Sequence, residues 1–139
     1  MIRSDLSQEE NSLIEHAERA RKNSYSPYSQ FPVGAALLLD DGSIYTGTNV
    51  ENASYGASLC AERIAVFKAI TDGLRKIRLV AIIADTKDPC SPCGLCRQVI
   101  NEFSDENTEV ILANFSAQIK KYKLTELLPE SFGPKDLMG

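Results

Sequence analysis

The sequence of residues 79–113 is LVAIIADTKDPCSPCGLCRQVINEFSDENTEVILA. Its two ends, 79–84 and 110–113, are apolar runs with the length of strands that are buried on both faces. Between them, the residues from Cys93 to about Phe103 have the pattern of a helix. A strand, a helix and a strand in this order predict part of a sheet with helices packed on it.

The residues upstream of this stretch extend the same fold. An apolar run at 33–39 and a second strand at 43–48 flank Asp40-Asp41-Gly42, which predicts a hairpin around an Asp-Gly turn. Residues 60–70 predict a helix that ends at Gly73. We therefore expect an α/β fold with a central sheet and helices on both faces.

The beginning of the chain carries a capping box, Ser7-Gln8-Glu9-Glu10, which predicts the start of an amphipathic helix. One side of this helix carries Leu13, Ile14, Ala17 and Ala20. The only histidine, His16, lies in the same helix. We interpret it as a helix-surface residue rather than a catalytic base.

Length and composition limit the classes of protein. The 139 residues, of which 43% are hydrophobic, predict one domain spanning 1–139. A net charge of -4 provides no basic surface for nucleic acid and favours a small soluble ligand. No apolar stretch approaches the roughly 20 residues of a membrane helix, and residues 1–5 lack a signal-peptide core. We expect a cytoplasmic protein without a membrane partner.

Two cysteine motifs predict a zinc site. They are Cys60-Ala61-Glu62 and Pro92-Cys93-Gly94-Leu95-Cys96, the known pattern of zinc deaminases, in which the glutamate is not a ligand. Three thiolates leave the fourth position of zinc open, as in catalytic sites, where water reaches a pKa of about 7. Glu62 could then transfer protons.

A closed structural zinc site is the alternative, because Cys90 lies three residues before Cys93. Pro89 and Pro92 favour an extended approach to the helix, so we expect Cys90 to point elsewhere. Cys90 as a fourth ligand, or no metal at all, remains open. A disulfide framework is not favoured, because no secretory segment opens the chain.

Two arginines lie close to the motifs. Zinc with three thiolates carries a net negative charge, and Arg63 could donate a hydrogen bond to a ligand sulfur and offset that charge. Arg97 is a second candidate for this role. The alternative for both is a solvated surface charge.

Several further motifs occur in a fixed order. They are Asn49-Val50-Glu51-Asn52-Ala53-Ser54-Tyr55, Cys60-Ala61-Glu62-Arg63, Pro92-Cys93-Gly94-Leu95-Cys96-Arg97-Gln98 and Leu127-Leu128-Pro129-Glu130-Ser131-Phe132-Gly133-Pro134. From about Ser24 to Leu137, the chain resembles the small homotetrameric cytidine deaminases. The resemblance implies a three-layer α/β/α sandwich with a central mixed sheet of about five strands.

The resemblance also implies the catalytic roles. Cys60, Cys93 and Cys96 would bind one zinc ion per subunit, Glu62 would be the proton shuttle, and Arg63 would neutralise ligand charge. The implied reaction is the zinc-dependent hydrolysis of cytidine and 2′-deoxycytidine to uridine and 2′-deoxyuridine with release of ammonia, a step of pyrimidine salvage.

Substrate contacts are implied in the same way. Asn49 and Glu51 would bind the ribose, Phe31 would pack on the pyrimidine, and the Ala61 backbone would meet the base edge. Tyr55 and Phe132 would complete the site of a neighbouring subunit, and Gln98 would lie near the metal ligands. Without the resemblance, Phe31 and Phe132 are candidates for ordinary packing residues.

Three other readings of the motifs remain. A deaminase of an aminopyrimidine antibiotic such as blasticidin S would share the metal motifs. We would not expect such an enzyme to carry the ribose pair Asn49 and Glu51 together with Phe31 and Phe132. A polynucleotide-editing deaminase would need a basic channel. A structural zinc module would need Cys90 as a ligand and would leave Glu62 without a role.

Overall fold

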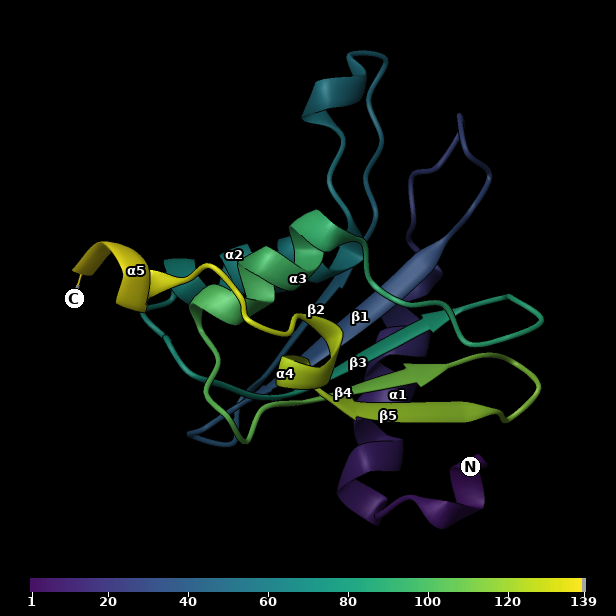
Figure 1. Cartoon of the computed structure of the whole chain (residues 1–139). Helices are drawn as coiled ribbons and strands as arrows, with labels where there is room; N and C mark the ends of the chain where they lie inside the picture. The colour runs from purple at the N-terminus through teal and green to yellow at the C-terminus, as the bar shows by residue number, and fades with distance from the viewer. Residues whose placement is uncertain (139) are drawn as a thin grey trace.

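The computed structural model describes residues 1–138, and its centre is a sheet of five strands in the order β2-β1-β3-β4-β5 (Figure 1). The strands are β1 (Val33–Leu39), β2 (Ile44–Thr48), β3 (Ile77–Ala84), β4 (Glu109–Ala113) and β5 (Ile119–Lys123). β3 and β4 are parallel and the other neighbours are antiparallel, so the sheet is mixed, as expected.

Within residues 1–138, five α-helices accompany the sheet. They are α1 (Gln8–Arg21), α2 (Ala61–Thr71), α3 (Gly94–Glu102), α4 (Leu124–Leu127) and α5 (Pro134–Met138). Two short 3-10 turns occupy Arg3–Asp5 and Tyr55–Ala57. No helix within residues 1–138 is both long enough and apolar enough to cross a membrane.

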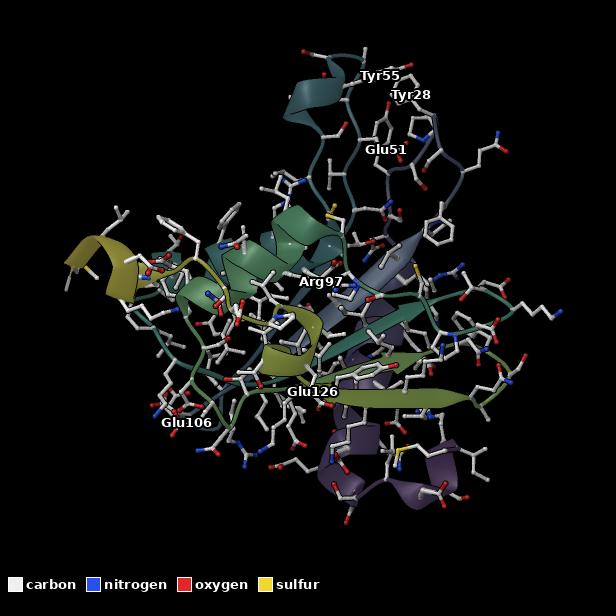
Figure 2. All side chains as sticks on the ribbon, in the orientation of Figure 1. Tyr28, Glu51, Tyr55, Arg97, Glu106 and Glu126 are labelled. Atoms are coloured by element: carbon white, nitrogen blue, oxygen red, sulfur yellow. The ribbon has the colours of Figure 1, made fainter. Side chains whose placement is uncertain are left out.

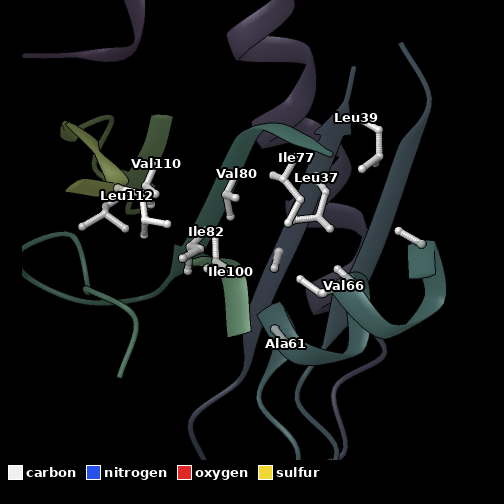
Figure 3. Close-up of a cluster of buried hydrophobic side chains, with 14 residues drawn as sticks. Leu37, Leu39, Ala61, Val66, Ile77, Val80, Ile82, Ile100, Val110 and Leu112 are labelled. Atoms are coloured by element: carbon white, nitrogen blue, oxygen red, sulfur yellow. The ribbon is translucent and has the colours of Figure 1, made fainter. Parts of the chain in front are cut away.

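The side chains of the sheet alternate between two hydrophobic clusters. Leu37 of β1 and Ile82 of β3 pack with Val66 of α2 and with Ile100 of α3 (Figure 3). Ala36 and its neighbours on the opposite face pack with Leu13, Ile14 and Ala17 of α1. Helices therefore cover both faces, and the expected three-layer sandwich is confirmed.

Most elements lie where the sequence predicts them. Ser7 caps α1: its hydroxyl accepts from the Glu10 N–H at 3.1 Å, and the Glu10 carboxylate accepts from the Ser7 N–H at 2.9 Å. Gly42 in the hairpin turn and Gly73 after α2 both have positive φ, at 87° and 90°. The residues of β5 and of α4 and α5 were not predicted individually.

Two glycines allow helices to lie directly on the sheet. A Cβ at Gly34 of β1 would overlap the Ala17 carbonyl of α1, and a Cβ at Gly47 of β2 would lie 2.7 Å from the Ala65 nitrogen of α2. Helix α2 therefore packs against β2 through its backbone, which fixes where its first residues lie.

Two loops project beyond the same end of the sheet (Figure 1). One joins α1 to β1 and the other joins β2 to α2. The rings of Tyr28 and Tyr55 link the two loops, with centroids 5.8 Å apart in an edge-to-face arrangement (Figure 2). The starts of α2 and α3 lie beside the base of these loops.

Candidate active site

Three cysteines meet where helices α2 and α3 begin. Cys60 is the N-cap of α2, Cys93 is the N-cap of α3, and Cys96 lies buried in the first turn of α3. Their Sγ atoms lie within 4.8 Å of one another. Because helix N-termini favour thiolate over thiol, the backbone of both helices supports metal-ligating sulfurs here.

The donor set fits zinc. Tetrahedral zinc with Zn–S bonds of about 2.3 Å places its sulfurs about 3.8 Å apart, which is within the spread of these three atoms. Three protein ligands leave one position of a tetrahedral ion for another ligand. The structure thus brings together the three cysteines that the sequence motifs single out.

Cys90 is not part of this cluster. Its thiol lies 3.7 Å from the Ser91 carbonyl oxygen, and its side chain lines the adjoining cavity. All four cysteines are free thiols. The geometry therefore favours the open three-thiolate site over a closed four-cysteine site.

The two arginines have different surroundings. Nη2 of Arg63 lies 3.6 Å from the Cys60 sulfur and 3.4 Å from the Ser58 carbonyl. Arg97 instead donates to the carbonyls of Pro92 at 2.8 Å and Leu127 at 2.6 Å, and to the Ser91 hydroxyl. Arg97 is thus bonded to the segment before Cys93 and not to a sulfur, so only Arg63 has the expected contact.

The thiols of the cluster change one another's pKa. The pKa of Cys60 falls to about 5, because the Cys96 thiol bonds to its sulfur and Arg63 lies beside it. The same contact with Cys60, together with burial, raises the pKa of Cys96. Burial raises the pKa of Glu62, and the negative charge of Cys60 adds to this effect.

A cavity of about 480 Å³ opens beside the cysteines, within the size range of small-molecule sites. Glu62, only 4% exposed, lines it together with Cys60 and Cys93. The other expected site residues in its wall are Phe31, Asn49, Glu51, Tyr55, Ala61 and Arg63. The cavity is therefore bordered by the cysteine cluster, a buried carboxylate and the two projecting loops.

The polar pair in the wall is held from several sides. Oδ1 of Asn49 accepts from the Ser24 hydroxyl at 2.6 Å and from the Val33 N–H at 3.0 Å. Oε1 of Glu51 accepts from the backbone N–H groups of Tyr28 and Ser29 at 3.0 and 3.1 Å. The Ser29 hydroxyl donates to the other carboxylate oxygen and is the main reason that the pKa of Glu51 is lowered.

Two expected site residues do not lie at the cavity of their own chain. Phe132, 59% exposed, instead lines a second hollow with Phe67 and Phe103. Nε2 of Gln98 donates to the Phe132 carbonyl at 3.0 Å, and Gln98 is not among the residues that line the cavity.

Some residues of the wall were not predicted from the sequence. Ser29, Ser58 and Ile82 line the cavity. Ser29 lies 22 positions before Glu51, and no local motif connects the two. The sequence Ser26-Pro27-Tyr28-Ser29 has the composition of a turn and contains no separate sign of binding.

Comparison with known proteins agrees with this geometry. The family model described as "Cytidine and deoxycytidylate deaminase zinc-binding region" matches residues 7–112. A cytidine deaminase of Sporosarcina psychrophila is 50% identical over 125 residues, which cover 90% of this chain and 92% of that protein. A cytidine deaminase of Halalkalibacterium halodurans is also 50% identical over 125 residues, covering 90% of this chain and 95% of that protein.

Solved structures give the same result. A crystal structure of cytidine deaminase from Burkholderia pseudomallei matches with a TM-score of 0.85 and 43% identity, covering 91% of this chain and all of that one. Because the family model spans most of the sequence and the relatives match along nearly their whole length, this chain belongs to the family that carries the cytidine and deoxycytidylate deaminase zinc-binding region.

Proposed function

We propose that this protein is a zinc-dependent cytidine deaminase, which hydrolyses cytidine and 2′-deoxycytidine to the corresponding uridines and ammonia. The observation that carries the proposal is the three-thiolate cluster beside the buried Glu62, at a cavity of about 480 Å³. Relatives of about the same length that are named cytidine deaminases support the choice of substrate.

The catalytic roles follow the geometry of the cluster. Cys60, Cys93 and Cys96 hold the zinc ion, which when bound supplies Lewis acidity that makes water nucleophilic at neutral pH. Arg63 offsets the negative charge of the thiolates through its contact with the Cys60 sulfur. The assignment of the three cysteines is supported by their Sγ atoms, which lie within 4.8 Å of one another.

Glu62 carries the protons. Its carboxylate takes one proton from the water that attacks C4 of the pyrimidine and delivers it to ring N3; it then takes the second proton from the C4 hydroxyl so formed and delivers it to the departing amine. Burial keeps the carboxyl away from bulk water, which would compete for these transfers. Ammonia then leaves and the uracil base remains.

The cavity wall positions the nucleoside. Phe31 packs on the pyrimidine ring, and the Ala61 backbone meets the base edge. Asn49 and Glu51 bind the ribose, because an amide and a carboxylate together can satisfy a hydroxyl that donates and accepts. All four residues line the same cavity, which supports this arrangement.

At a larger scale, we propose one catalytic domain spanning 1–139 in a cytoplasmic homotetramer that takes part in pyrimidine salvage. Tyr55 and Phe132 would complete the sites of neighbouring subunits. Phe132 is 59% exposed and lies away from the cavity of its own chain, which supports this role, whereas Tyr55, 75% exposed, also lines the cavity of its own chain.

The test is the release of ammonia and the formation of uridine from cytidine and 2′-deoxycytidine by zinc-loaded protein, beside a metal-stripped control. We expect turnover of both nucleosides only when zinc is bound. Zinc retention without turnover would contradict the proposal and would direct attention to aminopyrimidine antibiotics as substrates.

A further inference from the structure

The carboxylate of Glu51 is held by a short segment of the opposite projecting loop (Figure 2). Three donors come from Tyr28 and Ser29: two backbone N–H groups to Oε1 and the Ser29 hydroxyl to Oε2. A carboxylate has about four lone-pair sites, so one further donor can be accepted. The orientation of that last site depends on the donors that hold the other three.

The amide of Asn49 has one free donor, which complements the free acceptor site of Glu51. Its Oδ1 already accepts from Ser24 and Val33, and its Nδ2 donates to the Phe31 carbonyl at 2.9 Å. These partners fix the orientation of the amide, because a backbone N–H requires the oxygen and a carbonyl requires the nitrogen. One N–H remains, so Asn49 can donate to a ligand hydroxyl and Glu51 can accept from it.

The Ser29 hydroxyl joins these groups. Besides donating to Glu51, its Oγ accepts from the Phe31 N–H at 3.1 Å. The backbone of Phe31 is therefore bonded to Ser29 through its nitrogen and to Asn49 through its oxygen. Gln30 between them has a φ of 54°, a conformation that non-glycine residues adopt mainly where surrounding bonds enforce it.

We propose that Ser29 is a positioning residue for the sugar: its hydroxyl holds the Glu51 carboxylate in the orientation that accepts a hydrogen bond from a ribose hydroxyl. Ser29 acts through Glu51 and does not take part in the proton transfers. The inference rests on the proposed nucleoside function, and it adds a residue outside the motifs that carry the resemblance to the family.

The experiment pairs two changes, one in the protein and one in the substrate. Zinc-loaded wild-type and Ser29→Ala protein are assayed with cytidine and with 2′,3′-dideoxycytidine, which lacks both ring hydroxyls. We expect Ser29→Ala to raise KM for cytidine about tenfold and to leave kcat within about twofold. On dideoxycytidine the two proteins should differ by less than about twofold, because the bond that Ser29 supports is already missing.

Two further variants separate positioning from folding. Ser29→Thr keeps the hydroxyl and should restore most of the cytidine KM. Ser43→Ala is the matched control, since the Ser43 hydroxyl also donates to a carboxylate, that of Asp41 at 2.5 Å, in the remote β1–β2 turn. It should have wild-type kinetics. An equal loss on both nucleosides, or a fall in kcat at constant KM, would overturn the inference.

Binding of the uridine products distinguishes this inference from the proposed function. Equilibrium dissociation constants for uridine and 2′,3′-dideoxyuridine are measured with the same proteins. If wild-type protein lacked turnover but bound uridine in a Ser29-dependent manner, the proposed reaction would fail and the positioning role would hold. Uridine binding that is equal in wild type and Ser29→Ala would overturn the positioning role.

Discussion

At the scale of single residues, the four cysteines separate into three that meet and one that does not. Cys60, Cys93 and Cys96 share the cluster, whereas Cys90 only lines the cavity beside it. Cys93 is the N-cap of α3 and Cys90 lies three residues before it, yet only Cys93 belongs to the cluster. The pair therefore offers an internal comparison.

Substitution of each cysteine by serine tests this separation. Cys93→Ser should lose zinc and turnover, because a serine hydroxyl is a poor replacement for a thiolate ligand. Cys90→Ser should keep one zinc per chain and retain kcat within about threefold, since it removes no ligand. Zinc content by elemental analysis and turnover of cytidine are the readouts. Loss of zinc from Cys90→Ser would instead support a closed four-cysteine site.

The sequence predicted those site residues that belong to short motifs of neighbouring residues. Cys60 and Glu62 share one turn of a helix, and the P-C-x-x-C motif shares another. Ser29 was not predicted, because its contact with Glu51 joins two loops that are distant in sequence. Gln98 was expected near the metal ligands, but its amide bonds to the Phe132 carbonyl.

At the scale of elements, α1 is fastened to the far edge of the sheet. The Glu10 carboxylate at its first turn lies 2.5 Å from Nζ of Lys121 on β5 and also accepts from the Ser7 N–H. Burial raises the pKa of Glu10, but the hydrogen bonds from Lys121 and Ser7 outweigh this and leave the pKa lowered. Ionised Glu10 therefore stabilises the folded chain.

Glu10→Gln should lower the free energy of unfolding at pH 7 by about 0.5–1 kcal/mol. The folded-state pKa lies below the unfolded one, so the contribution is present above the unfolded pKa and disappears as pH falls through the folded value. The difference between the proteins should thus begin to shrink as pH falls through the unfolded value of about 4.3 and vanish below the folded pKa. Urea unfolding at several pH values measures it.

Glu15→Gln on an exposed position of the same helix is the matched control and should show less of this pH-dependent difference. If the free energy of unfolding of Glu10→Gln stayed below that of wild type by the same amount down to acid pH, packing and not the charge of Glu10 would account for the difference.

Elements with strong periodicity were predicted, and those without it were not. β1, β3 and β4 are apolar runs, and they lie in the interior of the sheet order. β5 has the sequence Ile119-Lys120-Lys121-Tyr122-Lys123 with one buried residue, which is the composition of an edge strand that discourages further pairing. Its place depends on pairing with β4, so local pattern alone cannot identify it.

At the scale of the whole molecule, the cavity of one chain lacks an aromatic residue that the family resemblance assigns to the site. Phe132 instead lines a hollow beside α3, and its carbonyl accepts a hydrogen bond from Gln98. In the proposed homotetramer, a neighbouring subunit would supply this aromatic residue.

Mixed oligomers test whether subunits share their sites. Phe132→Ala should reduce kcat/KM at least about tenfold, because an aromatic contact with the substrate is lost. When Phe132→Ala and Glu62→Gln subunits are dissociated and reassembled together, activity should return, since some sites then combine an intact Glu62 with a neighbour's intact Phe132. Activity no greater than the sum of the separate variants would contradict shared sites.

The central claim is that three thiolates hold zinc while Glu62 carries protons and is not a ligand. The most direct measurement is therefore the zinc content and the cytidine turnover of Glu62→Gln, made on the same sample. We expect one zinc per chain, as in wild type, and a fall in kcat of at least about 10²- to 10⁴-fold. Turnover near the wild-type level, or loss of the metal, would contradict the role of Glu62 and with it the proposed mechanism.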